Sequence, residues 1–338
     1  MRLPSARGPV SAALIGYLTG QSTTIPAQPD LGNDDDLHMT LFVCYELAYR
    51  GWDGVDDAFE WDPEVLRLRA LAEARFTAQL HELVGAPEPV DPATVPARLR
   101  ELADADDGPS LSGYLRGRAT YEQFREFVMQ RSVYHLKEAD PHTWAIPRLG
   151  GDAKAALIEI QLDEYGNGRT PKMHQELFKQ TMRWFGLDTA YGAHVDVAST
   201  RTLANNNLMS LFGLHRRNRG MIIGHLAAYE MTSTQPNRAY GNGLRRLGGD
   251  PVATAFYDEH VEADAVHEQI AAHDMAGAFA RAEPELAGDV LFGARCALAL
   301  DAVWARDILD AWDKSDTSLR TRKKLAPAGT RTSPAMAA

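Results

Sequence analysis

The sequence predicts an all-α fold. Runs of helix-forming residues, with apolar positions every three or four residues, dominate the chain between about residues 37 and 318. No alternation of β-branched and polar residues lasts longer than four residues, and no fixed-period repeat is present. Two glycine-rich spots, Gly166–Gly168 and Gly241–Gly243, do not follow predicted strands, so neither indicates a dinucleotide-binding or phosphate-binding loop.

The N-terminal third divides into a lead-in and a helical extension. Residues 1–36 are rich in Pro, Ser, Thr, Gly and Asp, and we expect them to be flexible because they have little apolar surface to bury. A first helix is expected over residues 41–49, which form an apolar run. A second is expected over residues 63–83, because it begins with a proline and Asp62 is suited to cap it. We assign residues 37–120 to an N-terminal helical extension.

We assign residues 121–318 to a second helical domain. Its segments are rich in helix formers, and several begin with a capping residue followed by proline. The tail, residues 319–338, is basic and then rich in Pro, Thr and Ala, so we expect it to be disordered. Helices are expected over residues 121–137, 153–164, from 171 onward, 201–230 with a break near 217–220, 251–275 and 286–312.

The charge balance disfavours nucleic-acid binding, and the cysteine content excludes two kinds of site. The chain has 35 Lys and Arg against 46 Asp and Glu, a net charge of −11, whereas proteins that bind nucleic acid present a basic face. Its two cysteines lie far apart, which excludes a disulfide framework and a cysteine-rich zinc site. No apolar run reaches the roughly 18–20 residues of a membrane span. We therefore expect a cytoplasmic protein with no nucleic-acid or membrane partner.

The strongest motif lies in the predicted helix over residues 251–275. Positions i, i+4 and i+7 share a narrow face of an α-helix, and His260, Asp264 and His267 have this spacing. Apolar residues on the same stripe predict that it faces the core. Two imidazoles and a carboxylate are ligand types of non-haem iron, and a divalent cation would compensate the buried charge. A hydrogen-bonded His/Asp cluster without a metal is the alternative, and the pattern leaves both open.

Two other segments offer ligands of the same types. Carboxylate-bridged metal sites in helical bundles take Glu and His from several facing helices. Glu138 ends the predicted helix over residues 121–137, and His135, one turn earlier, is a rival ligand. Glu164 ends another predicted helix, and His174 lies in the first turn of the next. On one continuous helix the last two would lie about 80° apart, but the glycine-rich break between them allows them to converge.

Three segments carry these residues: YHLKEAD, LDEYGNGRTPKMH and HVEADAVH. Together they resemble the haem-oxygenase-like di-iron oxidases and oxygenases, a family often described as iron-containing redox enzymes. The stretch SLFGLHRRNRGMIIGHLAAYEMTS is similar to the N-oxygenase subgroup of that family. The resemblance covers roughly residues 121–312. It implies a seven-helix bundle that binds no haem, preceded by a helical extension that serves dimerisation, so we expect a homodimer.

The resemblance also implies two Fe(II) ions, with O2 as co-substrate. Glu164 would bridge the irons, with Asp264 close to both. In one enzyme of the subgroup a C-terminal cupin carries a further metal, and here we expect none because the chain ends soon after the last predicted helix. All six ligand positions of the family find a matching residue type. His174 and His260 would serve one iron, and Glu138 and His267 the other.

The function that follows is N-oxygenation of an amine or guanidine-like nitrogen in a small metabolite of natural-product biosynthesis, with an external electron donor. Glu230 is a candidate for binding a cationic nitrogen. Its alternative role is a buried salt bridge with Arg216, Arg217 or Arg219. Two other functions remain open: oxidative cleavage of a C–C bond in an amino acid or fatty acid, and non-catalytic metal binding by a helical protein.

Overall fold

The computed structural model describes residues 1–105 and 108–320, and for residues 263–266 it describes the backbone only. All the regular elements in these ranges are helices, which confirms the predicted all-α fold. The α-helices are α1 (Pro9–Leu18), α2 (Asp34–Glu46), α3 (Pro63–Val84), α4 (Val95–Asp104), α5 (Leu111–Gly117), α6 (Tyr121–His135), α7 (Asp140–Thr143), α8 (Gly151–Glu164), α9 (His174–Trp184), α10 (Thr200–Leu214), α11 (Arg219–Thr232), α12 (Thr234–Arg246), α13 (Pro251–Gln269), α14 (Ala278–Ala282) and α15 (Ala287–Asp313). A π-helical segment, Ile270–Gly277, continues α13 without a break in the chain.

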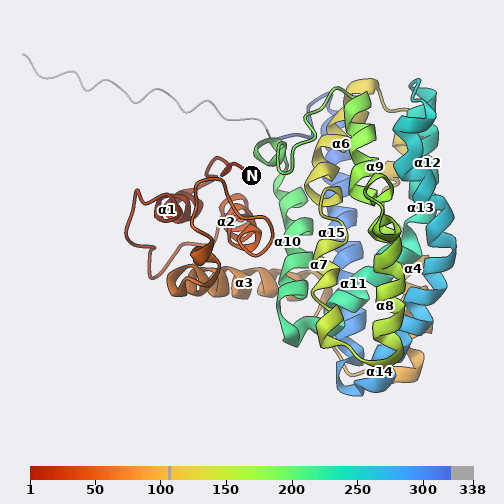
Figure 1. Ribbon diagram of the computed structural model, residues 1–338, viewed down its shortest axis with the longest axis horizontal. Coiled ribbons are helices and arrows are strands. Elements are labelled where there is room, and N and C mark those ends of the chain that lie inside the picture. The colour runs from red at the N-terminus through yellow and green to blue at the C-terminus, as the bar shows by residue number, and fades with distance from the viewer. Residues whose placement is uncertain (106–107, 321–338) are drawn as a thin grey trace, which may run out of the picture.

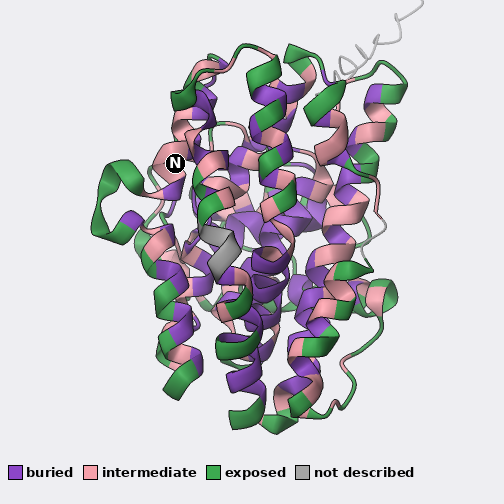
Figure 2. Ribbon diagram, turned by 90° about the vertical axis from the view of Figure 1, so that its right-hand side faces the viewer, coloured by how far each residue is buried: buried purple, intermediate pink, exposed green. Residues whose placement is uncertain are grey.

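The long helices from α6 onward form a bundle with their axes in roughly one direction (Figure 1). The most extensive packing joins α11 to α15, and α11 is buried along most of its length. Figure 2 shows buried residues lining the inner faces of the bundle, with exposed residues outside and at the ends. None of the described helices is both long enough and apolar enough to cross a membrane.

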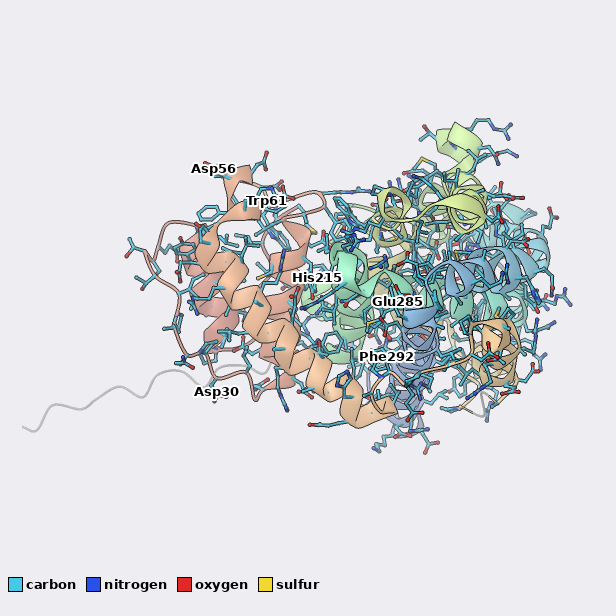
Figure 3. The ribbon with its side chains drawn as sticks, turned by 90° about the horizontal axis from the view of Figure 1, so that it is seen from below. Asp30, Asp56, Trp61, His215, Glu285 and Phe292 are labelled. Carbon is cyan, nitrogen blue, oxygen red and sulfur yellow. The ribbon has the colours of Figure 1, made fainter. Side chains whose placement is uncertain are left out.

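The first three helices stand to one side of the bundle (Figure 1). Figure 3 shows the outer part of this group, where Asp30, Asp56 and Trp61 are labelled. The sequence predicted no helix before residue 37, and this was wrong. Helix α1 lies in the lead-in and buries Val10 and Leu14, because a short apolar run is enough for a helix that packs against α2.

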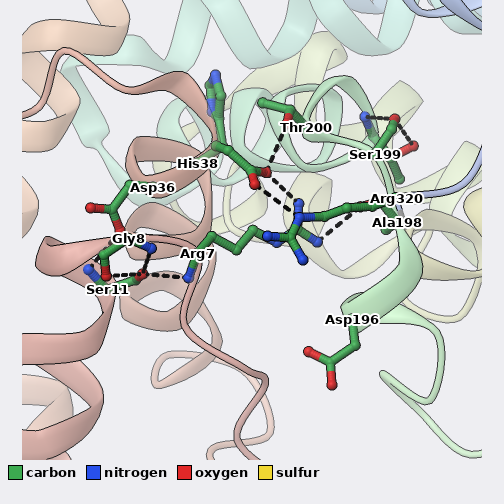
Figure 4. A network of polar contacts seen from close by, with 12 residues as sticks. Arg7, Gly8, Ser11, Asp36, His38, Asp196, Ala198, Ser199, Thr200 and Arg320 are labelled. Atoms are coloured by element: carbon green, nitrogen blue, oxygen red, sulfur yellow. Dashed lines mark hydrogen bonds and ion pairs between the residues drawn. The ribbon is translucent and has the colours of Figure 1, made fainter. Parts of the chain in front are cut away.

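A polar network ties this N-terminal group to the bundle (Figure 4). The buried guanidinium of Arg7 donates to Asp35 at 2.8 Å and to the carbonyl oxygens of Val195 and Ala198 at 2.8 and 2.9 Å. The Asp35 carboxylate also accepts from the Arg320 guanidinium at 2.8 Å. The group also packs directly on the bundle, α2 on α10 and α3 on α15, while α4 packs on α15 and α5 packs on α12. The predicted extension over residues 37–120 therefore contacts the bundle through each of its α-helices, and the division into domains stays a prediction.

Several predicted boundaries differ from the structure. Helix α9 begins at His174, because Thr170–Lys172 forms a 3-10 turn instead of its first turn. Helix α12 was missed because its glycines weaken the helical pattern. One of them, Gly243, permits close packing, since a Cβ there would lie 2.4 Å from the Leu115 carbonyl oxygen. The expected break near 217–220 is confirmed by the 3-10 turn between α10 and α11. Most of the predicted tail, residues 321–338, lies outside the described residues.

Candidate metal centre

Four of the predicted ligands meet inside the bundle. One ligand atom from each of Glu138, Glu164, His174 and His260 lies within 4.8 Å of the other three. All four side chains are at most 10 % exposed. They come from the segment after α6, the end of α8, the start of α9 and the middle of α13. We call this group the four-residue cluster.

The glycine-rich break brings Glu164 and His174 together. The Glu164 Oε2 and His174 Nδ1 atoms are 3.0 Å apart, although the two residues end and begin different helices. Gly166 makes this return possible: its φ is +62°, and a Cβ on it would lie 2.4 Å from the backbone carbon of Lys172. A residue with a side chain would therefore strain the backbone and collide with the returning chain. The loop closes because position 166 is glycine.

His260 is oriented by the backbone of its own helix. Its Nδ1 lies 2.8 Å from the Phe256 carbonyl oxygen, so Nδ1 carries the proton and donates it. The Nε2 atom then faces the cluster with its lone pair, 3.8 Å from Glu138 Oε1. Metal-binding histidines usually donate their other ring N–H to a carbonyl or carboxylate, which fixes the tautomer in this way.

The rival ligand His135 also lies beside the cluster. Its Nδ1 is 2.8 Å from Glu138 Oε1, and its ring packs on those of Phe178 and Phe256. Burial alone would raise the pKa of Glu138, but His135 and His260 hold it well below its ordinary value. Burial lowers the pKa of His135. The carboxylate thus stays ionised in a buried position, as a metal ligand must.

The donor atoms are placed as a metal ion would require. Glu138 Oε2 is buried and has no hydrogen-bond partner within the part of the chain that the structure describes, and such an atom is costly unless something else pairs it. Glu164 and His174 pair with each other; burial would lower the pKa of His174, but the Glu164 carboxylate raises it above its ordinary value. Adjacent ligands of an octahedral ion with bonds of about 2.1 Å lie about 3 Å apart, which matches the 3.0 Å between Glu164 and His174. Two carboxylates and two imidazoles suit iron.

The other two predicted ligands are not part of this cluster. His267 is buried on the same side of α13, but its Nε2 lies 3.0 Å from Asp163 Oδ2 and its Nδ1 lies 3.4 Å from Glu230 Oε2. Burial would lower the pKa of His267, and Glu230 and Asp163 outweigh it and raise the pKa to about 9. The Asp264 side chain lies outside the described residues. The roles of His267 and Asp264 as ligands stay predictions.

A cavity of about 300 Å³ reaches the cluster. Glu138, Glu164 and His260 border it, and its other walls include Tyr134, Tyr229, Tyr240, Arg131 and Asp301. The Arg131 guanidinium donates to Asp301 at 2.9 Å and stacks over Trp304. Glu230 lines this cavity next to His267. Arg219, one of the arginines predicted as a salt-bridge partner of Glu230, pairs with Glu283 at 2.8 Å. A cavity with mixed aromatic and polar walls suits a small molecule.

Two polar features of the cavity were missed in the sequence. Gln161 donates its amide to the Ala139 carbonyl at 2.9 Å and to Thr143 at 2.7 Å, and its buried Oε1 has no hydrogen-bond partner among the described residues. His142 borders the cavity and pairs with the buried His225 at 3.1 Å. Gln161 lies three residues before Glu164, and His142 lies four residues after Glu138. Residues at this spacing share a helix face, so the spacing could have predicted that both lie near the ligands.

Comparison with known proteins agrees with this geometry. The sequence profile of a family described as iron-containing redox enzymes, which are haem-oxygenase-like, matches residues 125–302. This chain belongs to the iron-containing redox enzyme family. That membership accounts for the helical bundle and makes the protein an oxidoreductase, and the four-residue cluster lies within the matched residues, in a part of the fold where an iron site is chemically suitable.

Known relatives of this iron-containing redox enzyme are distant. A nitrosourea synthase from Streptomyces achromogenes subsp. streptozoticus is 26 % identical over 147 residues, which cover 44 % of this chain and 31 % of the relative. Two crystal structures of a CADD-like protein of unknown function from Nostoc punctiforme share 16 % identity and give a TM-score of 0.46. They cover 71 % and 73 % of this chain and 98 % of the Nostoc chain.

Proposed function

We propose that this iron-containing redox enzyme is a non-haem di-iron, O2-dependent N-oxygenase. Its substrate is an amine or guanidine-like nitrogen of a small metabolite. The observation that carries the proposal is the four-residue cluster at the border of the cavity, where four buried ligand-type side chains meet a space of about 300 Å³. The similarity to a nitrosourea synthase supports a reaction at nitrogen, although the match spans 31 % of that protein.

The metal, when bound, supplies activation of O2 by Fe(II). The overall reaction converts an N–H bond to N–OH, with one oxygen atom of O2 going to nitrogen and the other to water. Two electrons and two protons must enter besides those of the amine. An external electron donor supplies these electrons. The protein binds the metal, holds the substrate nitrogen beside it and excludes bulk water.

The residues around the cavity favour a nitrogen donor as substrate. Glu230, which contacts His267 at 3.4 Å, would offer its carboxylate to a cationic nitrogen. The Oε1 of Gln161, which has no hydrogen-bond partner among the described residues, offers an acceptor for a second N–H. Tyr134 and Tyr229 supply aromatic surface next to the ligands. Because burial raises the pKa of both phenols, they stay neutral at physiological pH and do not compete with the carboxylates for a cation.

An iron titration followed by an isotope experiment tests the proposal. Anaerobic Fe(II) is added to metal-free protein, and we expect about two irons per chain, the loading of a two-metal site. The loaded protein is then given ¹⁸O2, a chemical reductant and a panel of small amines and guanidines. A product that carries ¹⁸O on nitrogen supports the proposal. Loss of a carbon fragment would instead support the C–C-cleaving alternative, and iron binding without O2 uptake would support a non-catalytic protein.

A pair of matched variants controls for stability effects. Glu164→Gln removes one donor of the cluster, and we expect it to abolish O2 uptake and to weaken iron binding by more than tenfold. Glu159→Gln changes an exposed carboxylate on the same helix and should leave both unchanged. Analytical ultracentrifugation tests the homodimer, which we propose from the family resemblance.

A further inference from the structure

A tight loop between α8 and α9 presents two exposed cations next to the candidate metal centre. The loop runs from Gly166 to Met173, and Figure 1 shows it between the two helices. The side chains of Arg169 and Lys172 are exposed, and neither forms an ion pair within the described residues. They lie five and two positions before His174, a member of the four-residue cluster.

Hydrogen bonds hold this loop in one shape. The backbone N–H groups of Arg169 and Lys172 donate to the carbonyl oxygens of Gly166 and Arg169 at 3.0 and 2.8 Å. At its base, the Asn167 amide donates to Asp163 at 2.8 Å. The close approach of Gly166 to Lys172 fixes where the chain returns to the bundle. The two cations are therefore presented by a defined surface.

A second, small opening lies between the end of this loop and the cluster. It has a volume of about 10 Å³, roughly that of one water probe. Met173, His174 and Gln175 line it on the loop side, and Glu138 and Glu164 line it on the cluster side. The larger cavity has no loop residue in its lining, so it approaches the cluster by another route. The C-terminal end of the loop thus borders the cluster directly.

A third cation enlarges the positive area. Arg50 is exposed and its guanidinium donates to Gln175 at 3.2 Å, which places it beside the small opening. The acidic neighbours have partners: Glu176 pairs with Lys179 at 2.6 Å, and Asp163 pairs with His267 at 3.0 Å. Asp140, which lines the small opening, accepts from the Tyr165 hydroxyl at 2.8 Å and faces Arg50. In a chain of net charge −11, this local excess of positive charge stands out. We call the surface of Arg50, Arg169 and Lys172 the cationic face.

We propose that the cationic face docks an acidic one-electron redox protein that supplies electrons to the metal centre. The inference rests on the proposed function, because N-oxygenation consumes two electrons and two protons beyond those of the amine. Two successive one-electron deliveries balance each turnover, and the carrier leaves oxidised by one electron each time. Opposite charges steer such short-lived complexes, which bury small interfaces. Electron transfer falls steeply with distance, so the loop that leads directly into His174 is a suitable place to dock.

Binding to metal-free protein tests the docking surface without any turnover. The probe is a plant-type [2Fe–2S] ferredoxin, titrated by calorimetry at low ionic strength and again at high salt. We expect binding that weakens steeply with salt. We also expect Arg169→Glu/Lys172→Glu to weaken it at least tenfold, with Arg169→Gln/Lys172→Gln in between. Arg216→Glu/Arg217→Glu reverses two exposed arginines of another 3-10 turn and should change it less than twofold.

Electron delivery supplies the second readout. With ferredoxin as the donor, substrate oxidation should fall at least tenfold in Arg169→Glu/Lys172→Glu, whereas oxidation driven by a small chemical reductant should stay at the wild-type rate. Equal ferredoxin binding by this variant and wild type would overturn the inference, and so would absence of binding at low salt. If the chemical reductant drives no oxidation in the wild type, the proposed function fails, and the calorimetric result still decides the docking surface.

Discussion

Removing one partner of a buried ion pair beside the metal centre should destabilise the protein and weaken iron binding together. Lys137 precedes Glu138 in the chain, and its ammonium pairs with Glu46 of α2. The side chains are 1 % and 0 % exposed. The ammonium also lies 4.3 Å from the centre of the Tyr49 ring, and the Tyr191 hydroxyl donates to Glu46 at 2.7 Å. Helix α2 thereby holds the segment that carries a candidate ligand.

The variant Glu46→Gln isolates the charge. The amide keeps the shape and still offers an oxygen to Tyr191, but Lys137 is left as an uncompensated buried cation. Such a loss typically costs 3–5 kcal/mol. Unfolding entropy of about 2.1 cal/mol/K per residue gives roughly 0.7 kcal/mol/K for this chain, so the melting temperature should fall by about 4–7 °C. Because Glu138 is the next residue, Fe(II) affinity should fall about tenfold.

Thermal and urea unfolding of metal-free protein measure the first effect, and anaerobic Fe(II) titration measures the second. The double variant Glu46→Gln/Lys137→Met has no buried charge at this position. We expect it to recover at least about 2 kcal/mol of the free energy of unfolding that Glu46→Gln loses. Asp35→Asn is the control, since it loosens the N-terminal group from the bundle far from Glu138. A loss below about 1 kcal/mol in Glu46→Gln, or strictly additive effects in the double variant, would refute the reasoning.

Three further predictions concern the site itself. Gly166→Ala should destabilise the chain by about 1–3 kcal/mol and weaken Fe(II) binding about tenfold, measured by unfolding and titration. Gly168→Ala, with φ of +75° but no atom within 4 Å of the added Cβ, should strain the backbone and leave iron binding intact. Fe(II) at 100 times its Kd should raise the free energy of unfolding by about 2.7 kcal/mol, and Glu138→Gln should remove that gain in a melting assay. In metal-free protein, the raised pKa of His267, about 9, contributes stability that is complete below about pH 6.5 and lost as pH rises through 9. Because Asp163 is partly exposed, we expect a loss of about 2 kcal/mol between pH 6.5 and 9.5, and His267→Gln should abolish this dependence in urea unfolding.

The helices were predictable where local chemistry decides them. Asp62 caps α3 by accepting from the backbone N–H groups of Glu64 and Val65 at 2.9 and 3.0 Å, as its position before Pro63 indicated. Helices α1 and α12 were missed because packing outweighs their weak propensity. In α12 the glycines that lower propensity are also what allows close approach to α5. The same glycines therefore weakened the prediction of a helix and are required for its packing.

The site was predictable in its residue types and less so in its grouping. Helical spacing placed His260 and His267 on one buried stripe, which the structure bears out. Spacing along one helix does not say which neighbours face each turn. His260 contacts Glu138. His267 lies about 10.5 Å further along the helix axis and contacts Asp163 and Glu230. Asp163 belongs to α8 and Glu230 to α11, and the register of these helices against α13 is set by tertiary packing.

The adjacent residues Asp163 and Glu164 explain how one bundle keeps two acidic groupings apart. Neighbours on a helix point about 100° apart, so Glu164 faces His174 while Asp163 faces His267.

A metal in the four-residue cluster would need Glu164 and would leave the Asp163–His267–Glu230 contacts intact. A second metal that used His267 would have to replace those contacts, because an imidazole that binds a metal must be unprotonated at the ligating nitrogen. Since the pKa of His267 is about 9 without a metal, the second binding step should release protons and tighten with rising pH. The first step should release protons too, because Glu164 raises the pKa of His174. Fe(II) binding measured between pH 6.5 and 8.5 should therefore lose its second step in His267→Gln and keep the first step with its pH dependence unchanged. A second step that persists unchanged in His267→Gln would mean that His267 is not a ligand.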